Sequence, residues 1–120
     1  ALPILSDMCY LHIVNQHKPF YKEHAEDVKN IYNMVRDYLE KGMSRMEADD
    51  HAGISKTIDE IDKIKAYIAS IDKQHIKRIK KGEAKTRQSM LFFSILAHSE
   101  ETAEEFVELL KGYNETFANK

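Results

Sequence analysis

The sequence predicts an all-α protein, an antiparallel bundle of three long helices plus a short N-terminal helix. Three observations lead to this class. Only four Gly and two Pro interrupt the 120 residues, which leaves long uninterrupted segments. Apolar side chains recur along those segments every three or four residues, the spacing of one helix face. The chain is 42% hydrophobic and 32% charged, which is typical of a globular domain. We therefore expect one domain over residues 1–120.

The first element is expected to be a short helix over residues 2–17. Its apolar stripe is formed by Leu5, Met8 and Leu11 or His12. Pro19 should end this helix, because proline disfavours helical backbone in the residue before it. Residues 15–20 would then form a corner, in which we expect His17 to hydrogen-bond rather than to bind a metal ion.

The second helix is expected over residues 20–41. Its apolar positions repeat at helical spacing: Val28, Ile31, Tyr32, Val35, Tyr38 and Leu39. Gly42 should stop it, since glycine just past the last turn adopts left-handed backbone at little cost. Glu23 and Asp27 lie near the start, where the helix dipole favours acids. Residues 43–51 would form a polar connection.

The third helix is expected over residues 52–81 and the last over residues 86–117. Isoleucines and one histidine form a seam close to a heptad repeat in the third: Ile54, Ile58, Ile61, Ile68, Ile71 and His75. We expect His75 to pack at the end of this seam rather than to act as a ligand. Thr86 is a candidate N-cap for the last helix, whose apolar residues include Met90, Leu91, Phe93, Ile95 and Leu96. Short connections make the three long helices antiparallel.

Charge is unevenly distributed along the last two helices. Residues 73–87 hold seven Lys and Arg against one Glu, whereas residues 99–108 hold five Glu and no basic residue. The basic residues near the connection are Lys77, Arg78, Lys80, Lys81, Lys85 and Arg87. The helix dipole favours Lys80 and Lys81 at a C-terminus but disfavours Lys85 and Arg87 at a helix start.

This basic segment has two interpretations. It can bind an anion: anionic lipid at a membrane surface, an acidic patch on a transporter or partner subunit, or a phosphorylated small molecule. Alternatively, the five Glu of residues 99–108 neutralise it within the bundle. A separation of about 25 Å along one helix from Arg87 to Glu104 argues against full neutralisation. The formal net charge of −2 gives no overall field for nucleic acid.

Glu100 is the least expected residue of the last helix. It shares a stripe with Phe93, Leu96, Ala103 and Val107, and an unpaired ionised carboxylate is costly to bury. One interpretation places Glu100 at the edge of the core, paired with Lys or Arg. The other joins Glu100 and Glu104, with Glu23 or Asp27 from a facing helix, in a weak site for a hard divalent cation.

Other catalytic and metal-binding patterns are missing from the sequence. Cys9 is the one cysteine, which excludes an internal disulfide, fits a reducing compartment and leaves no zinc-ligand spacing. A di-iron bundle needs two Glu-x-x-His motifs, and the nearest match is a single Asp72-x-x-His75. No nucleophile–base pair can be argued from spacing, so we expect no enzyme activity. The longest apolar run, residues 90–97, is too short to span a bilayer.

Two segments of the last hairpin carry a family resemblance. Residues 75–80, HIKRIK, and residues 86–96, TRQSMLFFSIL, resemble the last helical hairpin of PhoU-like domains. The match is closest to the cytoplasmic extension of bacterial Pit-type inorganic phosphate transporters. The corner at residues 15–20 resembles that extension too, so the resemblance covers roughly residues 5–113.

The resemblance implies a fold and a role. PhoU-like domains are antiparallel bundles that regulate phosphate uptake and have no known enzymatic role. Many carry a carboxylate pair on the last helix, within a Glu-Arg-Ile-Gly-Asp type run, and some bind metal clusters there. The matching run here is Glu100-Glu101-Thr102-Ala103-Glu104, in which Glu100 and Glu104 keep the acidic pair and the intervening residues depart from the pattern.

The expected function is that of a cytoplasmic regulatory domain of a bacterial phosphate transporter, at the inner face of the plasma membrane. The chain begins at Ala1 rather than Met, so we expect a piece of a longer membrane protein. The candidate partners are the membrane portion of the same chain, a second copy of this domain and an anionic membrane surface. The alternative is a helical protein–protein interaction domain unrelated to phosphate. The full-length chain would discriminate the two.

Overall fold

A computed structural model describes residues 22–117, which are helical except for short turns and contain no strand. The helices are α2 (Lys22–Glu47), α3 (His51–Asp59), α4 (Ile61–Lys80) and α5 (Thr86–Phe117). The all-α class is thus confirmed, and so are the bounds expected for the last helix. The predicted first helix over residues 2–17 and the corner at residues 15–20 lie outside the described residues. No helix of the described part is long and apolar enough to cross a membrane.

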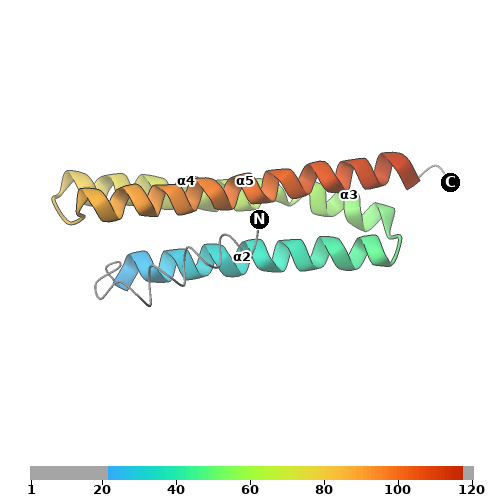
Figure 1. Cartoon of the computed structure of the whole chain (residues 1–120), viewed down its shortest axis with the longest axis horizontal. Helices are drawn as coiled ribbons and strands as arrows, with labels where there is room; N and C mark the ends of the chain where they lie inside the picture. Colours follow the sequence, from blue (N-terminus) through green and yellow to red (C-terminus); the bar gives the residue numbers. More distant parts are fainter. Residues whose placement is uncertain (1–21, 118–120) are drawn as a thin grey trace.

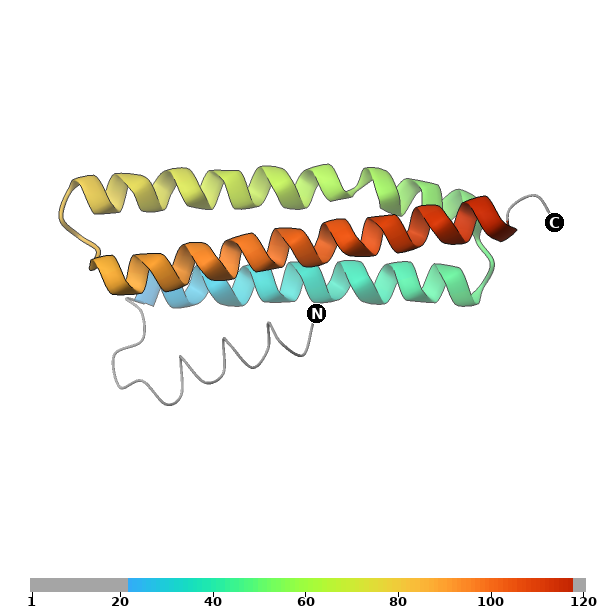
Figure 2. The ribbon, with the colours of Figure 1, turned by 45° about the horizontal axis from the view of Figure 1, so that its top comes forward.

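The helices form three long antiparallel rods (Figure 1). The first rod is α2, the second is α3 followed by α4, and the third is α5, which packs against both of the others (Figure 2). The α4–α5 turn and the start of α2 lie at one end of the bundle, and the α2–α3 turn lies at the other (Figure 1).

The core is built from the predicted apolar faces of all three rods. α2 contributes Val28, Ile31, Val35, Tyr38 and Leu39; α3 and α4 contribute Ile54, Ile61, Ile64, Ile68 and Ile71. α5 contributes Phe92, Ile95, Leu96, Ala103, Phe106, Val107 and Leu110. At the start of α5 the prediction was wrong, because Phe92 is buried there and Met90 is 70% exposed. The buried face runs through Ser89, Phe92 and Leu96, and a side chain one position from Ser89 points about 100° away from it.

Gly42 does not stop the second helix, contrary to expectation. α2 continues to Glu47, so most of the predicted connection at residues 43–51 is helical. Gly42 is buried against α5: a Cβ there would come within 2.3 Å of Cε2 of Phe106. The glycine therefore lets the Phe106 ring approach the α2 backbone closely. α2 ends instead at a turn in which Asp49 has φ 52°, and Asp50 caps α3 by accepting from the Gly53 amide at 2.9 Å.

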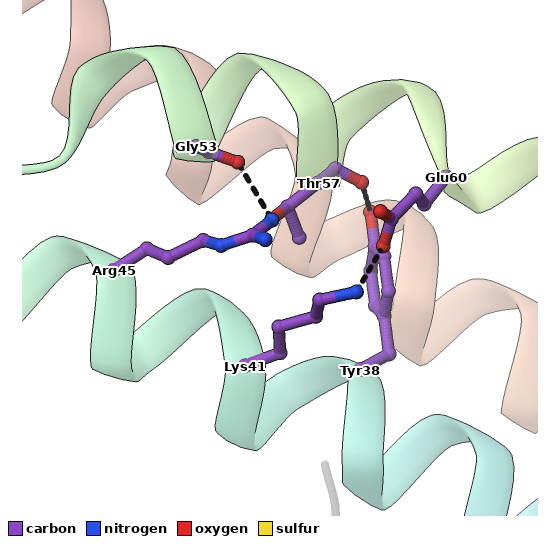
Figure 3. Close-up of polar contacts among 6 residues, drawn as sticks. All are labelled: Tyr38, Lys41, Arg45, Gly53, Thr57 and Glu60. Carbon is purple, nitrogen blue, oxygen red and sulfur yellow. Dashed lines mark hydrogen bonds and ion pairs between the residues drawn. The ribbon is translucent and has the colours of Figure 1, made fainter.

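The predicted helix over residues 52–81 is divided at Glu60, and Figure 3 shows the contacts at this break. The Thr57 carbonyl accepts the Tyr38 hydroxyl at 2.6 Å as well as the Glu60 amide at 3.1 Å. The Glu60 amide also donates to the Lys56 carbonyl at 3.1 Å, so it is shared between a regular i→i+4 contact and a tighter i→i+3 contact of the 3₁₀ type. Partners on α2 thus hold the break.

Charged side chains of α2 also contact the residues around this break. Lys41 Nζ lies 2.9 Å from the Glu60 carboxylate, an ion pair that lowers the pKa of Glu60 through hydrogen bonding. Arg45 Nη1 donates to the Gly53 carbonyl at 2.8 Å and also to the Thr57 hydroxyl. Two basic residues of α2 therefore bind backbone and side-chain acceptors around the α3–α4 junction (Figure 3).

Candidate functional site

The turn between α4 and α5 gathers the predicted basic residues at one end of the bundle. Gly82 has φ 74°, a left-handed conformation that suits glycine. The Glu83 amide donates to the Arg78 carbonyl at 2.8 Å, and the Gly82 amide donates to the Ile79 carbonyl at 3.0 Å. This pair of bonds is a Schellman motif, which ends α4 tightly. The turn therefore fixes the direction in which the basic side chains leave the bundle.

Five of the six predicted basic side chains are exposed around the α4–α5 turn, and we call these five the basic end: Lys77, Lys80, Lys81, Lys85 and Arg87. Within residues 22–117, none of these five makes an ion pair with a carboxylate. The Lys85 carbonyl accepts the Ser89 amide at 2.9 Å, so Lys85 rather than Thr86 occupies the N-cap position of α5. A lysine at the positive end of a helix dipole adds to the local positive potential.

Arg78 differs from the basic end. Its guanidinium is half-buried and pairs with the Asp27 carboxylate of α2 at 3.3 Å. Burial raises the pKa of Asp27, and the hydrogen bond from Arg78 partly offsets that rise. Arg78 therefore joins α4 to α2 and is the least available of the six for an external anion.

Exposed apolar side chains lie beside the basic end. Ile76 is 44% exposed, Ile79 is 40% exposed and Met90 is 70% exposed. The sequence analysis listed Met90 among the apolar residues of the last helix and did not identify it as exposed. A sequence signal was present for Ile76, which lies about 100° from His75 around the helix and so falls off the seam. No such signal marked Ile79, because it follows His75 by four residues and therefore continues the seam, yet it is exposed at the end of α4.

A buried pair of histidines lies beneath the basic end. His75 packs at the end of the isoleucine seam, as predicted, and is 0% exposed. The His24 ring meets it edge to face with centroids 4.5 Å apart, and the Phe92 ring lies 4.5 Å from His75. Nε2 of His75 lies 2.9 Å from the Ser89 hydroxyl. No local pattern indicates this contact, since His24 and His75 are 51 positions apart.

His75 is neutral at physiological pH. Burial, and then the charges of His24 and Arg78, lower its pKa to about 4, while Asp27 acts in the opposite direction. The neutral imidazole and the Ser89 hydroxyl can then form one hydrogen bond, in which Nε2 of His75 donates or accepts according to its tautomer.

The Ser89–His75 contact is not arranged for nucleophilic catalysis. An activated serine needs a base that is itself oriented by a third group. Nδ1 of His75 has no hydrogen-bond partner, and Ser89 is 4% exposed. The contact therefore serves packing in the described structure.

An acidic groove runs along α5 and the second rod. It has a volume of about 660 Å³ and is lined by six carboxylates: Asp59, Asp62, Glu101, Glu104, Glu105 and Glu108. Two lysines line it as well, with Lys65 3.2 Å from Glu104 and Lys111 3.6 Å from Glu108. The groove and the basic end lie on different parts of α5, so the bundle presents two surfaces of opposite charge.

The predicted metal ligands are only partly brought together. Glu104 pairs with Lys65 of α4, whereas Asp27 pairs with Arg78 of α4, 13 residues further along. That offset corresponds to about 20 Å along the bundle, so Asp27 does not join Glu104 in one site. The Glu23 side chain lies outside the described part. Among the described residues, no group of three or more His, Cys, Asp or Glu is arranged to hold a metal ion. The hypothesis that Glu100 and Glu104 bind a divalent cation is left to a binding measurement.

Comparisons with protein-family models, with curated protein sequences and with solved structures find no significant match to this chain.

Proposed function

We propose that the chain is a PhoU-like regulatory domain of a bacterial inorganic phosphate transporter, acting at the cytoplasmic side of the plasma membrane through protein or ligand contacts. One observation carries the proposal. The segments 75–80 and 86–96, which resemble the last hairpin of PhoU-like domains, form the end of α4 and the start of α5, joined by the Gly82 turn. The antiparallel arrangement of three rods supports it.

The proposed mode of action is regulation by contact. A domain shifts a transporter between conformations only if it binds one of them more tightly than the other. The bundle offers two surfaces for such differential contacts, the basic end and the acidic groove. The hydrogen bonds of the α4–α5 turn fix its backbone, which limits the backbone conformational entropy that is lost when a partner binds there.

The test has two arms. The first reads the full gene, in which a polytopic membrane segment should accompany these residues. The second measures phosphate uptake by cells that carry the full-length protein or a version lacking residues 22–117. We expect the deletion to change the uptake rate or its response to external phosphate while transporter abundance stays equal. Unchanged uptake at equal abundance would contradict the proposal.

The acidic groove favours a second candidate, a helical interaction domain unrelated to phosphate. Its six carboxylates against two lysines suit a basic, amphipathic helix of a partner protein. A gene without a polytopic membrane segment, together with phosphate uptake that does not depend on this chain, would support this candidate over the first.

A further inference from the structure

We propose that the basic end binds anionic lipid headgroups at a membrane surface, with the bundle standing end-on. Membrane binding is a property beyond regulation of transport. It depends only on the described residues of the bundle and not on the resemblance to PhoU-like domains. Two independent features carry it: unpaired positive charge and exposed apolar side chains at the same end of the bundle.

Within the described residues, the side chains of the basic end form no ion pair. The described carboxylates nearest in the fold are Glu83 in the turn and Glu26 and Asp27 near the start of α2, and Asp27 is already paired with Arg78. The Glu-rich part of α5 begins 13 residues after Arg87, about 20 Å along the helix, which exceeds the Debye length of about 8 Å at physiological salt. Basic clusters of this size are attracted to anionic leaflets.

The apolar side chains distinguish a membrane from a small anion. Ile76 precedes the last residue of α4 by four positions, and Met90 follows the first residue of α5 by four positions. Each therefore lies about 6 Å from its helix end, which matches the depth of roughly 5–10 Å to which interfacial apolar side chains enter a bilayer. A free phosphorylated molecule would use the charges but leave Ile76, Ile79 and Met90 in water.

The experiment measures sedimentation of the 120-residue protein with vesicles. One set of vesicles contains phosphatidylcholine alone, and the other contains phosphatidylcholine and phosphatidylglycerol in equal amounts. We expect binding to the second set, weakened at high salt. Reversing two charges, Lys81→Glu with Lys85→Glu, should weaken binding by about ten-fold or more.

A charge-matched control separates the surface from net charge. Lys56→Glu with Lys63→Glu changes the net charge equally on exposed positions of α3 and α4 outside the basic end, and should leave binding near wild type. Met90→Ser should weaken the binding that remains at high salt. Circular dichroism confirms that each variant keeps its helical content, and all five substituted positions are exposed.

Three results would overturn the proposal. The first is equal binding to both sets of vesicles, or none to either. The second is an equal loss in the two double variants, which would reduce the effect to net charge. The third is that inorganic phosphate displaces the protein from the vesicles while Met90→Ser binds them as well as the wild type does. That result would indicate a site for a free anion. Binding to an acidic protein surface instead of anionic vesicles would give the first result. Failure here leaves the phosphate-uptake test untouched.

Discussion

The rings of His24 and His75 meet edge to face, with centroids 4.5 Å apart, and both side chains are buried. The contact joins α2 to α4, and Ser89 and Phe92 of α5 close over His75. All three rods therefore meet at this point, directly beneath the basic end. A polar cluster at such a junction makes stability depend on protonation.

The first prediction concerns pH. The folded-state pKa of His75 is about 4, below its ordinary value of 6.5, so the unfolded chain holds a proton that the folded chain lacks between these values. Stability is therefore full above about pH 6.5 and falls on acidification, by about 1.4 kcal/mol per pH unit from this residue. Urea unfolding at several pH values measures the slope.

A matched pair of variants isolates that slope. His75→Gln should reduce the slope of unfolding free energy against pH by about the 1.4 kcal/mol per pH unit that one proton contributes. His98→Gln changes an exposed histidine of α5 and should leave that slope as it is in the wild type. Asp27 has a raised pKa and contributes with the opposite sign, so the comparison is made between variants rather than on wild type alone. If the plots of unfolding free energy against pH are parallel for the wild type and His75→Gln, the slope does not come from His75.

The second prediction concerns Gly42. Gly42→Ala should destabilise the protein, because the new Cβ would collide with the buried Phe106 ring. Overpacking costs about 1–3 kcal/mol, against roughly 1 kcal/mol gained from helix propensity. Gly112→Ala is the control: nothing lies within 4 Å of its Cβ, so the variant should gain up to about 1 kcal/mol. Thermal unfolding that shifts in the same direction for both would refute this reading of Gly42.

The third prediction concerns Tyr38. Burial, and then the carboxylates Glu60, Asp59 and Asp62, raise its pKa to about 12, so the hydroxyl donates to the Thr57 carbonyl throughout the neutral range. Tyr38→Phe should cost about 1 kcal/mol, because the carbonyl keeps the Glu60 amide as a donor. Tyr67→Phe, on a partly buried ring of α4, should be close to neutral. Urea unfolding measures both variants. If Tyr38→Phe and Tyr67→Phe lower the unfolding free energy equally, the Tyr38–Thr57 hydrogen bond adds no stability of its own.

The fourth prediction concerns metal binding by Glu100 and Glu104. Calorimetric titration with magnesium, manganese or iron(II) should give no saturable heat, because two carboxylates, one shared with Lys65, supply too few oxygen ligands for a hard cation. Lys65→Ala removes the ion-pair partner of Glu104, so this variant is the one in which weak metal binding would be easiest to detect. Saturable heat in the wild-type protein that disappears in Glu100→Gln would establish the site instead.

The sequence by itself determined the helical class, the apolar faces of α2 and α4, and the bounds of α5. Those features follow from local periodicity, which repeats many times along a long helix: Val28, Ile31 and Val35 report the same face again and again. Lys80, Lys81 and Lys85 could be placed at one end of the hairpin because a turn so short leaves no other arrangement. The basic end was predictable for this reason.

The tertiary structure alone decided the features that depend on one contact between distant residues. Gly42 reads as a stop in a local pattern, and it became an interior residue because Phe106 packs on it. The break at Glu60 depends on a hydroxyl of α2, and the burial of His75 depends on His24. A single contact across the bundle leaves no period in the sequence, since its energy arises only when packing brings the partners together.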